Sequence, residues 1–439
     1  SYLSLLFLSI AVNFTAGAAL QEEGRSLAHK KKLLIFAIAA NLLMLGYFKY
    51  VDFFIYHVNF FFNMDVLAKN ILLPLGISFY TITQIAYLID SYEGVVKEQN
   101  MLTYSVFVTF FPHLLIGPII HHKQMIPQFE SMRAKLPSYK NLSLGVFLFA
   151  IGLFKKGVIA DELKPYADIV YDTLSHPSFF ESWIGSTAYT LQLYFDFSGY
   201  SDMAVGSAML FNIKLPINFN SPYKAKGLIE FWQRWHMSFT IFIFTYIYAP
   251  ILRSMKKITF SGAIFAMTVT LIIAGVWHGA AFGFMLFYLI HSGGLVVNHM
   301  WRKYKVFTLP SHLAWLLTFN VIIVSLVPFR AVTLIDTIKV YKGMLGLNGI
   351  VFPKIAQLDS IYDYFRVEHS GRLSFSGVEV MHYMLIFPIL VFTILFIKNS
   401  NELAEKMKFN LTNCLFTTLT LIYALLHGKH VSEFLYFQF

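Results

Sequence analysis

Apolar stretches long enough to cross a lipid bilayer recur along almost the whole chain. Hydrophobic residues make up 57% of its 439 residues and charged residues only 13%, against about 25% charged residues in a soluble domain. A spanning helix needs about 20 apolar residues, so about eleven or twelve stretches qualify as transmembrane or re-entrant helices. The sequence therefore predicts an all-α polytopic membrane protein, with apolar stretches at 3–20, 33–56, 71–89, 102–120, 141–160, 182–209, 237–252, 260–277, 279–298, 312–329, 380–398 and 411–427.

The formal net charge of +10 is gathered in short basic clusters, which are typical of cytoplasmic loops. Such clusters also attract anionic cofactors and lipids, and none has the form of a nucleic-acid-binding stripe. We therefore expect a lipid bilayer, and no nucleic acid, among the partners. Odd numbers of spans separate the first three clusters, so either a re-entrant segment lies among them, which we favour, or one cluster is not cytoplasmic. The clusters lie at 30–32, 123–140, 253–257, 302–305 and 398–408.

Because no linker or repeat is visible, we predict one membrane domain over 1–439. Its longest non-spanning stretch, 331–379, is extracytoplasmic if the basic cluster at 302–305 is cytoplasmic. This stretch begins with the amphipathic piece LIDTIKVYKGML. We interpret it as an interfacial cap or a docking surface, and an ordinary surface loop is the alternative.

Two tryptophan–histidine pairs lie at or inside apolar stretches, and one of them is Trp277-His278 in LIIAGVWHGAAFG. Ionisable groups at membrane depth are costly and usually functional, and a neutral imidazole exchanges a proton near pH 7. Gly275 and Gly279 allow a neighbouring helix or a ligand to approach closely. His278 is therefore a candidate general base for a hydroxyl acceptor. A packed histidine that bonds a carbonyl is the alternative.

The other pair, Trp235-His236, lies in GLIEFWQRWHMSF, which looks like an amphipathic helix that enters the membrane. Glu230 and Arg234 are four residues apart in the order that favours an ion pair. Trp232 and His236 share a helix face at the same spacing. The alternative is an aromatic belt at headgroup level that carries a passenger histidine.

Several polar residues fall in the middle of the apolar stretch 182–209, within LQLYFDFSGYSDMAVG. Buried carboxylates there need protonation, donors or a cation. Asp196 and Asp202 are six residues apart, so in one unbroken helix they lie on different faces. They could act as an acid–base pair only if the helix were broken at Gly199. We favour a hydrogen-bonding scaffold that shapes a cavity, and a sodium or proton site is the competing interpretation.

Other polar residues have simpler interpretations. His113, His121 and His122 are interpreted as interfacial, because adjacent histidines rarely bind one ion well, and we predict no metal site. Arg330 ends the apolar stretch 312–329, so we expect its side chain to reach to the interface.

Nine motifs, taken in order, resemble those of the membrane-bound O-acyltransferase superfamily, in its bacterial branch of alginate and peptidoglycan O-acetyltransferases. They are NLLMLGYFKY, LPLGISFYTITQIAYLID, FFPHLLIGPI, GLFKKGVIAD, LQLYFDFSGYSDMAVG, INFNSPY, EFWQRWHMS, GVWHGA and PFRA. The resemblance implies a central tunnel and a cytoplasmic acetyl donor, acetyl-CoA, with no permanently bound cofactor. It also implies the bacterial inner membrane, a periplasmic partner enzyme and a polysaccharide acceptor, for which we favour peptidoglycan over alginate.

The resemblance further makes His278 of the WHG motif the central catalytic residue and His236 the second one. We expect the basic loops to help bind the donor nucleotide. The remaining candidate substrate-binding residues are Trp235, Arg234, Asp196, Ser198, Tyr200 and Trp277, where Arg234 contacts the donor nucleotide and Trp277 packs on the imidazole.

The chain departs from the family pattern in two places. Phe244 and Thr245 stand where relatives carry Arg and Asp, and relatives have additional spans before Ser1, so we expect a truncated start or a shortened branch. Three alternatives to acetyl transfer remain: transfer of D-alanine or another acyl group to a teichoic acid or glycan, secondary transport, and haem binding by His236 and His278.

Overall fold

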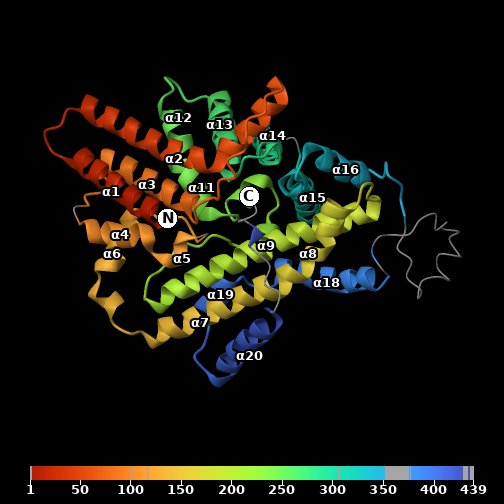
Figure 1. Cartoon of the computed structure of the whole chain (residues 1–439). Helices are drawn as coiled ribbons and strands as arrows, with labels where there is room; N and C mark the ends of the chain where they lie inside the picture. The colour runs from red at the N-terminus through yellow and green to blue at the C-terminus, as the bar shows by residue number, and fades with distance from the viewer. Residues whose placement is uncertain are drawn as a thin grey trace, which may run out of the picture. The chain divides into compact units, whose positions relative to one another are not determined.

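The computed structural model describes residues 2–98, 100–115, 117–304, 307–351, 375, 377–428 and 434–435. Within these residues all regular secondary structure is helical, which confirms the predicted all-α class (Figure 1). The main helices are α1 (Tyr2–Gln21), α2 (Leu27–Phe62), α3 (Ile77–Tyr92), α4 (Met101–Thr109), α5 (Phe111–Leu114), α6 (His122–Glu130), α7 (Tyr139–Phe154), α8 (Asp161–Asp168), α9 (Phe179–Leu210), α10 (Leu228–Trp232), α11 (Met237–Ile243), α12 (Ala249–Arg253), α13 (Phe260–His278), α14 (Phe282–Tyr304), α15 (Ser311–Arg330), α16 (Leu334–Met344), α18 (Gly377–Phe396), α19 (Ser400–Glu405) and α20 (Leu411–His427).

Five helical stretches in the described part of the chain are long and apolar enough to cross a membrane. One of them joins α7 to α8 through π-helical turns and runs without a break from Tyr139 to Thr173. The others are α1, α2, α13 and α15, and shorter apolar helices lie at Met237–Arg253, Val380–Phe396 and Leu411–His427.

The apolar stretch 102–120 does not form a single helix, because the chain leaves α4 at Phe110 and then forms only the short α5. Pro112 has no backbone N–H to donate to the carbonyl of Val108, and in an unbroken helix its ring would clash with that carbonyl. Beyond α5 the backbone is irregular, and the N–H of Ile119 donates to Ser238 Oγ at 2.9 Å. Irregular backbone at membrane depth needs such partners from the protein itself.

The chain divides into two compact units. The first unit comprises 1–149, 200–218 and 236–266, and the second comprises 150–199, 219–235 and 267–439. The prediction of a single membrane domain stays a prediction.

The core of the first unit joins α1, α2 and α3 through buried polar side chains. Asn13 and Asn41 exchange side-chain hydrogen bonds of 3.1 and 2.7 Å, and Gln84 donates to Ser9 Oγ at 2.9 Å. Small residues complete the fit, because a Cβ at Gly17 would lie 2.3 Å from the ring of Tyr87. Interhelical amide bonds and small residues are typical of packing within membranes.

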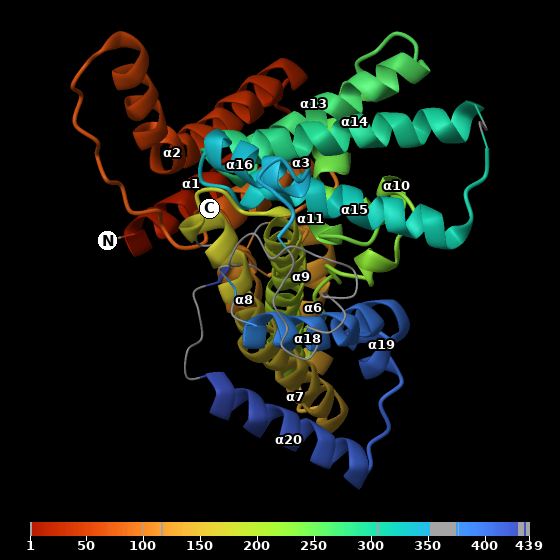
Figure 2. The ribbon, with the colours of Figure 1, turned by 90° about the vertical axis from the view of Figure 1, so that its right-hand side faces the viewer.

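In the second unit α14 and α15 pack together, antiparallel (Figure 2). A Cβ at Gly283 would lie 2.0 Å from the carbonyl oxygen of Pro328, so only glycine permits this approach. By contrast, nothing lies within 4 Å of the Cβ position of Gly293, on the same helix.

The amphipathic piece predicted after α15 is α16, which begins with a capping box between Thr333 and Asp336. It buries Val340 and exposes Ile335 and Ile338. Burial alone would raise the pKa of Asp336, but hydrogen bonds from Thr333 and Lys339 outweigh it and hold that pKa below its usual range. The rest of the predicted extracytoplasmic stretch, at 352–374 and 376, lies outside the described residues.

We predict that Gly283→Ala lowers the stability of the protein by about 1–3 kcal/mol, the usual cost of overpacking. The matched control is Gly293→Ala, which should leave stability unchanged or raise it by up to about 1 kcal/mol, because alanine is the better helix former. The measurement is the midpoint of thermal unfolding in detergent. Equal midpoints for the two variants would contradict the close approach of α14 to α15.

Candidate active site

His278 is the last residue of α13, and its side chain is buried with 5% of its surface exposed. Nδ1 lies 2.8 Å from the carbonyl oxygen of Ala274. A carbonyl oxygen can only accept, so Nδ1 carries a hydrogen and donates it. The imidazole is therefore fixed at the end of α13 with Nδ1 as a donor.

The glycines on either side of Trp277-His278 face α14. A Cβ at Gly275 would lie 3.3 Å from Met285 Cα and from Tyr288 Cδ2, and one at Gly279 would lie 2.2 Å from the ring of Phe284. Gly275 and Gly279 predicted the close approach of a neighbouring helix or a ligand, and the neighbour is α14 of the same unit. Trp277 packs edge-on against the imidazole, with ring centroids 4.8 Å apart.

Tyr288 on α14 completes the surroundings of the imidazole. Its hydroxyl oxygen lies 3.2 Å from Nδ1 and 3.4 Å from Nε2 of His278, and its side chain is only 2% exposed. Tyr288 was not among the predicted site residues, because a tyrosine in the run FGFMLFYLIH resembles any other aromatic core residue. The sequence feature that could have indicated Tyr288 is its position three residues before a second histidine, His291.

The aromatic residues of the FWQRW segment gather in the same unit as His278. Phe231 and Trp235 stack at 5.5 Å, and Trp232 stacks on Tyr288 at 5.7 Å. Trp235 also contacts aromatic rings of α9 and its neighbours, namely Tyr194, Phe197, Phe219 and Tyr223. Trp235 and His278 therefore belong to one continuous aromatic assembly.

The ion pair predicted between Glu230 and Arg234 is confirmed, with Arg234 Nη2 2.9 Å from Glu230 Oε1. Arg234 Nη1 also donates to the carbonyl oxygen of Asn220 at 3.2 Å, and the Asn220 N–H donates to the Arg234 carbonyl at 2.9 Å. The guanidinium thus braces the INFNSPY segment and remains about one third exposed.

The prediction that one amphipathic helix carries both Trp232 and His236 is wrong. Helix α10 ends at Trp232, and His236 has the left-handed φ of 43° from which α11 begins. A backbone bond from Met237 N–H to the Asn218 carbonyl at 2.9 Å holds this turn. Left-handed backbone is strained for a side chain other than glycine and persists only where the surroundings impose it.

His236 belongs to the first unit, as does Tyr200, whereas the other predicted site residues belong to the second. The imidazole of His236 is 2% exposed and lies against Phe239, with ring centroids 5.0 Å apart.

Asp196 on α9 is 1% exposed and forms an ion pair with Lys156 at 2.9 Å. The Leu435 N–H also donates to its carboxylate, at 3.2 Å. Helix α9 runs on without a break at Gly199, so Asp196 and Asp202 do not act as an acid–base pair. Asp196 is thus an anchor between helices, which favours the scaffold interpretation. Nearby, Lys155 Nζ lies 3.5 Å from Ser198 Oγ.

Gly199 has a packing role in place of the expected break. A Cβ there would lie 2.7 Å from the carbonyl oxygen of Gly152, so the glycine lets α9 approach α7.

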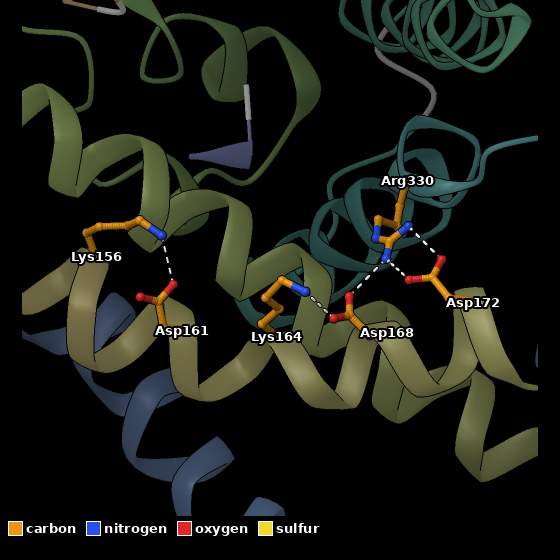
Figure 3. A network of polar contacts seen from close by, with 6 residues as sticks. All are labelled: Lys156, Asp161, Lys164, Asp168, Asp172 and Arg330. Carbon is orange, nitrogen blue, oxygen red and sulfur yellow. Dashed lines mark hydrogen bonds and ion pairs between the residues drawn. The ribbon is translucent and has the colours of Figure 1, made fainter. Parts of the chain in front are cut away.

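Charged side chains follow one face of the helix from Lys156 to Asp172 (Figure 3). Arg330 Nη2 donates to Asp168 at 2.9 Å and to Asp172 at 2.5 Å, and Nη1 donates to Asp172 at 3.1 Å. The side chain therefore does not simply reach to the interface as expected. The full stripe, with alternating sign, is Lys156, Asp161, Lys164, Asp168, Arg330 and Asp172.

The histidines expected to be interfacial have mixed surroundings. His113 is fully buried and bonds the Phe107 carbonyl, and His122 Nε2 lies 3.1 Å from Glu98 Oε2 in a buried pair. His122 therefore has a buried acidic partner. No grouping of three possible metal ligands occurs in the described ranges.

Comparison with known proteins shows the family to which the chain is similar. The model of the membrane-bound O-acyltransferase family matches residues 3–325. A peptidoglycan O-acetyltransferase of Helicobacter pylori is 37% identical, over 100% of this chain and 88% of its own length. A probable alginate O-acetylase of Pseudomonas aeruginosa is 31% identical, over 88% of this chain and 72% of its own length. A teichoic acid D-alanyltransferase of Bacillus subtilis is 28% identical over 57% of this chain and 67% of its own length.

A helical membrane protein with a buried histidine at a helix end fits an acyl-transfer enzyme. The chain belongs to the membrane-bound O-acyltransferase family. It is a multi-pass membrane protein and an acyltransferase.

We predict that Lys156→Met destabilises the protein by about 3–5 kcal/mol, because it leaves the carboxylate of Asp196 buried without its cation. Replacing both partners, in Lys156→Met with Asp196→Leu, should recover part of that loss, since no buried charge of the pair then remains. Thermal unfolding in detergent measures both. A double variant no more stable than Lys156→Met alone would show that the pair does not account for the loss.

Proposed function

We propose that the protein is an O-acetyltransferase of the bacterial inner membrane that passes an acetyl group from a cytoplasmic donor, acetyl-CoA, to a cell-surface polysaccharide. The similarity to a peptidoglycan O-acetyltransferase over the whole chain supports peptidoglycan as the acceptor over alginate. The observation that carries the proposal is the placement of His278, a buried imidazole at the end of α13 whose Nδ1 is bonded to the Ala274 carbonyl.

In the proposed reaction, Nε2 of His278 takes the proton of an acceptor hydroxyl as its oxygen attacks the thioester carbonyl carbon. The tetrahedral oxyanion that forms then collapses and expels the thiolate. The imidazolium returns its proton to that thiolate, so the products are an ester and a free thiol. A periplasmic partner enzyme is proposed to complete transfer of the acetyl group to the polysaccharide.

D-Alanyl transfer to a teichoic acid is the second candidate. It is supported by the 28% identity to a teichoic acid D-alanyltransferase, which covers little more than half of this chain. The two functions share the attack of a hydroxyl on a thioester and differ in the donor.

We predict that His278→Ala lowers acetyl transfer about 10²–10⁴-fold, the usual contribution of a general base. The assay is transfer from labelled acetyl-CoA by protein reconstituted in liposomes. The matched control is His427→Gln, which changes an exposed histidine on α20 and should leave the rate unchanged.

Unchanged acetyl transfer by a folded His278→Ala variant would overturn the assignment of the base. Transfer from a D-alanyl thioester, with none from acetyl-CoA, would favour the second candidate. His236→Ala, assayed in parallel, tests the second histidine and should also lower the rate.

If Arg234 binds the anionic part of the donor, Arg234→Gln should raise the KM for acetyl-CoA roughly tenfold, the value of one charged hydrogen bond. Glu230→Gln is the matched control, because it breaks the same ion pair but keeps the guanidinium. An equal rise of KM in both variants would mean that Arg234 serves only to brace the INFNSPY segment.

A further inference from the structure

His291 on α14 is a second buried histidine of the same unit, with none of its surface exposed. The indole N–H of Trp232 lies 3.1 Å from its Nδ1, and Ser325 Oγ lies 2.8 Å from its Nε2. An indole N–H can only donate, so Nδ1 accepts and Nε2 carries the hydrogen. Nε2–H then donates to Ser325, whose hydroxyl donates to the Ile322 carbonyl at 2.8 Å.

This chain of hydrogen bonds runs in one direction, from Trp232 through His291 and Ser325 to a backbone carbonyl. Each donor in it has an acceptor, so the ring of His291 has no free lone pair and is unsuited to take a proton from a substrate. Satisfied buried networks of this kind fix the orientation of their members. The member that it orients is the indole of Trp232.

The indole of Trp232 lies against Tyr288, the residue whose hydroxyl contacts His278. The two rings stack at 5.7 Å with 27° between their planes. Gly275 of α13 also contacts the ring of Tyr288, because a Cβ there would lie 3.3 Å from Cδ2. Tyr288 and His291 are three residues apart and so share a face of α14. Tyr288 is thus held both by the indole and by the bare backbone of α13.

We propose that Trp232, His291 and Ser325 are positioning residues that hold the hydroxyl of Tyr288 against the imidazole of His278. This inference rests on the proposed role of His278 as the base. When Nε2 takes a proton, the phenol oxygen at 3.4 Å accepts from it and stabilises the imidazolium. Misplacement of a catalytic group by about 1 Å costs on the order of 10²-fold in rate, which sets the scale of the effect.

The first test compares variants of His291 in the liposome assay with labelled acetyl-CoA. His291→Ala should lower kcat about 10–100-fold and leave the KM for acetyl-CoA unchanged. His291→Gln should recover most of that loss, because its amide both accepts from Trp232 and donates to Ser325. If His291 served folding alone, His291→Ala would lower the yield of folded protein and His291→Gln would not restore kcat. That result would overturn the proposal.

A double-mutant cycle tests whether Trp232 acts through Tyr288. Trp232→Phe keeps a stacking ring but removes the N–H, and Tyr288→Phe removes the hydroxyl. Each alone should lower kcat about 10–100-fold, and the double variant should be no slower than Tyr288→Phe. Independent, multiplying losses would contradict a path from Trp232 through the tyrosine.

A third measurement does not depend on activity. Solid-state NMR of ¹⁵N-histidine-labelled protein in liposomes reports which ring nitrogen carries the hydrogen, with His291→Gln and His278→Gln used for assignment. We expect Nδ1–H on His278 and Nε2–H on His291, and an altered His278 signal in Trp232→Phe. If these signals were found in a protein that transfers no acetyl group, the proposed function would be wrong, but the hydrogen bonds from Trp232 through His291 to Ser325 would be supported. A hydrogen on Nδ1 of His291 would contradict those hydrogen bonds whatever the activity.

Discussion

Within an apolar bundle, polar side chains must bond to one another, and this constraint shapes both units of the protein. Asn13 and Asn41 join helices of the first unit by reciprocal amide bonds. In the second unit a buried ion pair joins Lys156 to Asp196. The hydrogen bonds of His291 follow the same constraint, because a fully buried imidazole must find its partners within the protein. The bonds that stabilise the fold therefore also orient the candidate site.

His278 and His291, both buried in the second unit, show how bonding partners assign different roles to one residue type. A carbonyl fixes a hydrogen of His278 on Nδ1, and an indole fixes that of His291 on Nε2. We assign the first to the chemistry, while the second uses both ring nitrogens to hold its neighbours in place. Since the rings are linked through Trp232 and Tyr288, the supporting histidine lies only two side chains from the candidate base.

Hydropathy predicted the helical class, and the glycines around His278 predicted a close neighbour, because both depend on local composition. The left-handed turn at His236 was missed, since hydropathy does not register where a backbone turns. Tyr288 was missed because its role depends on a contact with another helix. The partners of Arg330 lie about 160 positions earlier in the chain, beyond the range of any local pattern.

The charged face of the helix between Tyr139 and Thr173 has a consequence for the order of assembly in the membrane. Each charged residue at the centre of a spanning helix costs about 2.5–3.5 kcal/mol when the helix inserts alone. Two of the partners that neutralise this helix, Asp196 and Arg330, are synthesised later in the chain. Insertion of this helix alone therefore costs more than its insertion beside α9 and α15, although Lys156–Asp161 and Lys164–Asp168 already pair within the helix. The charge that remains favours assembly of the helix with these two later elements over its separate insertion.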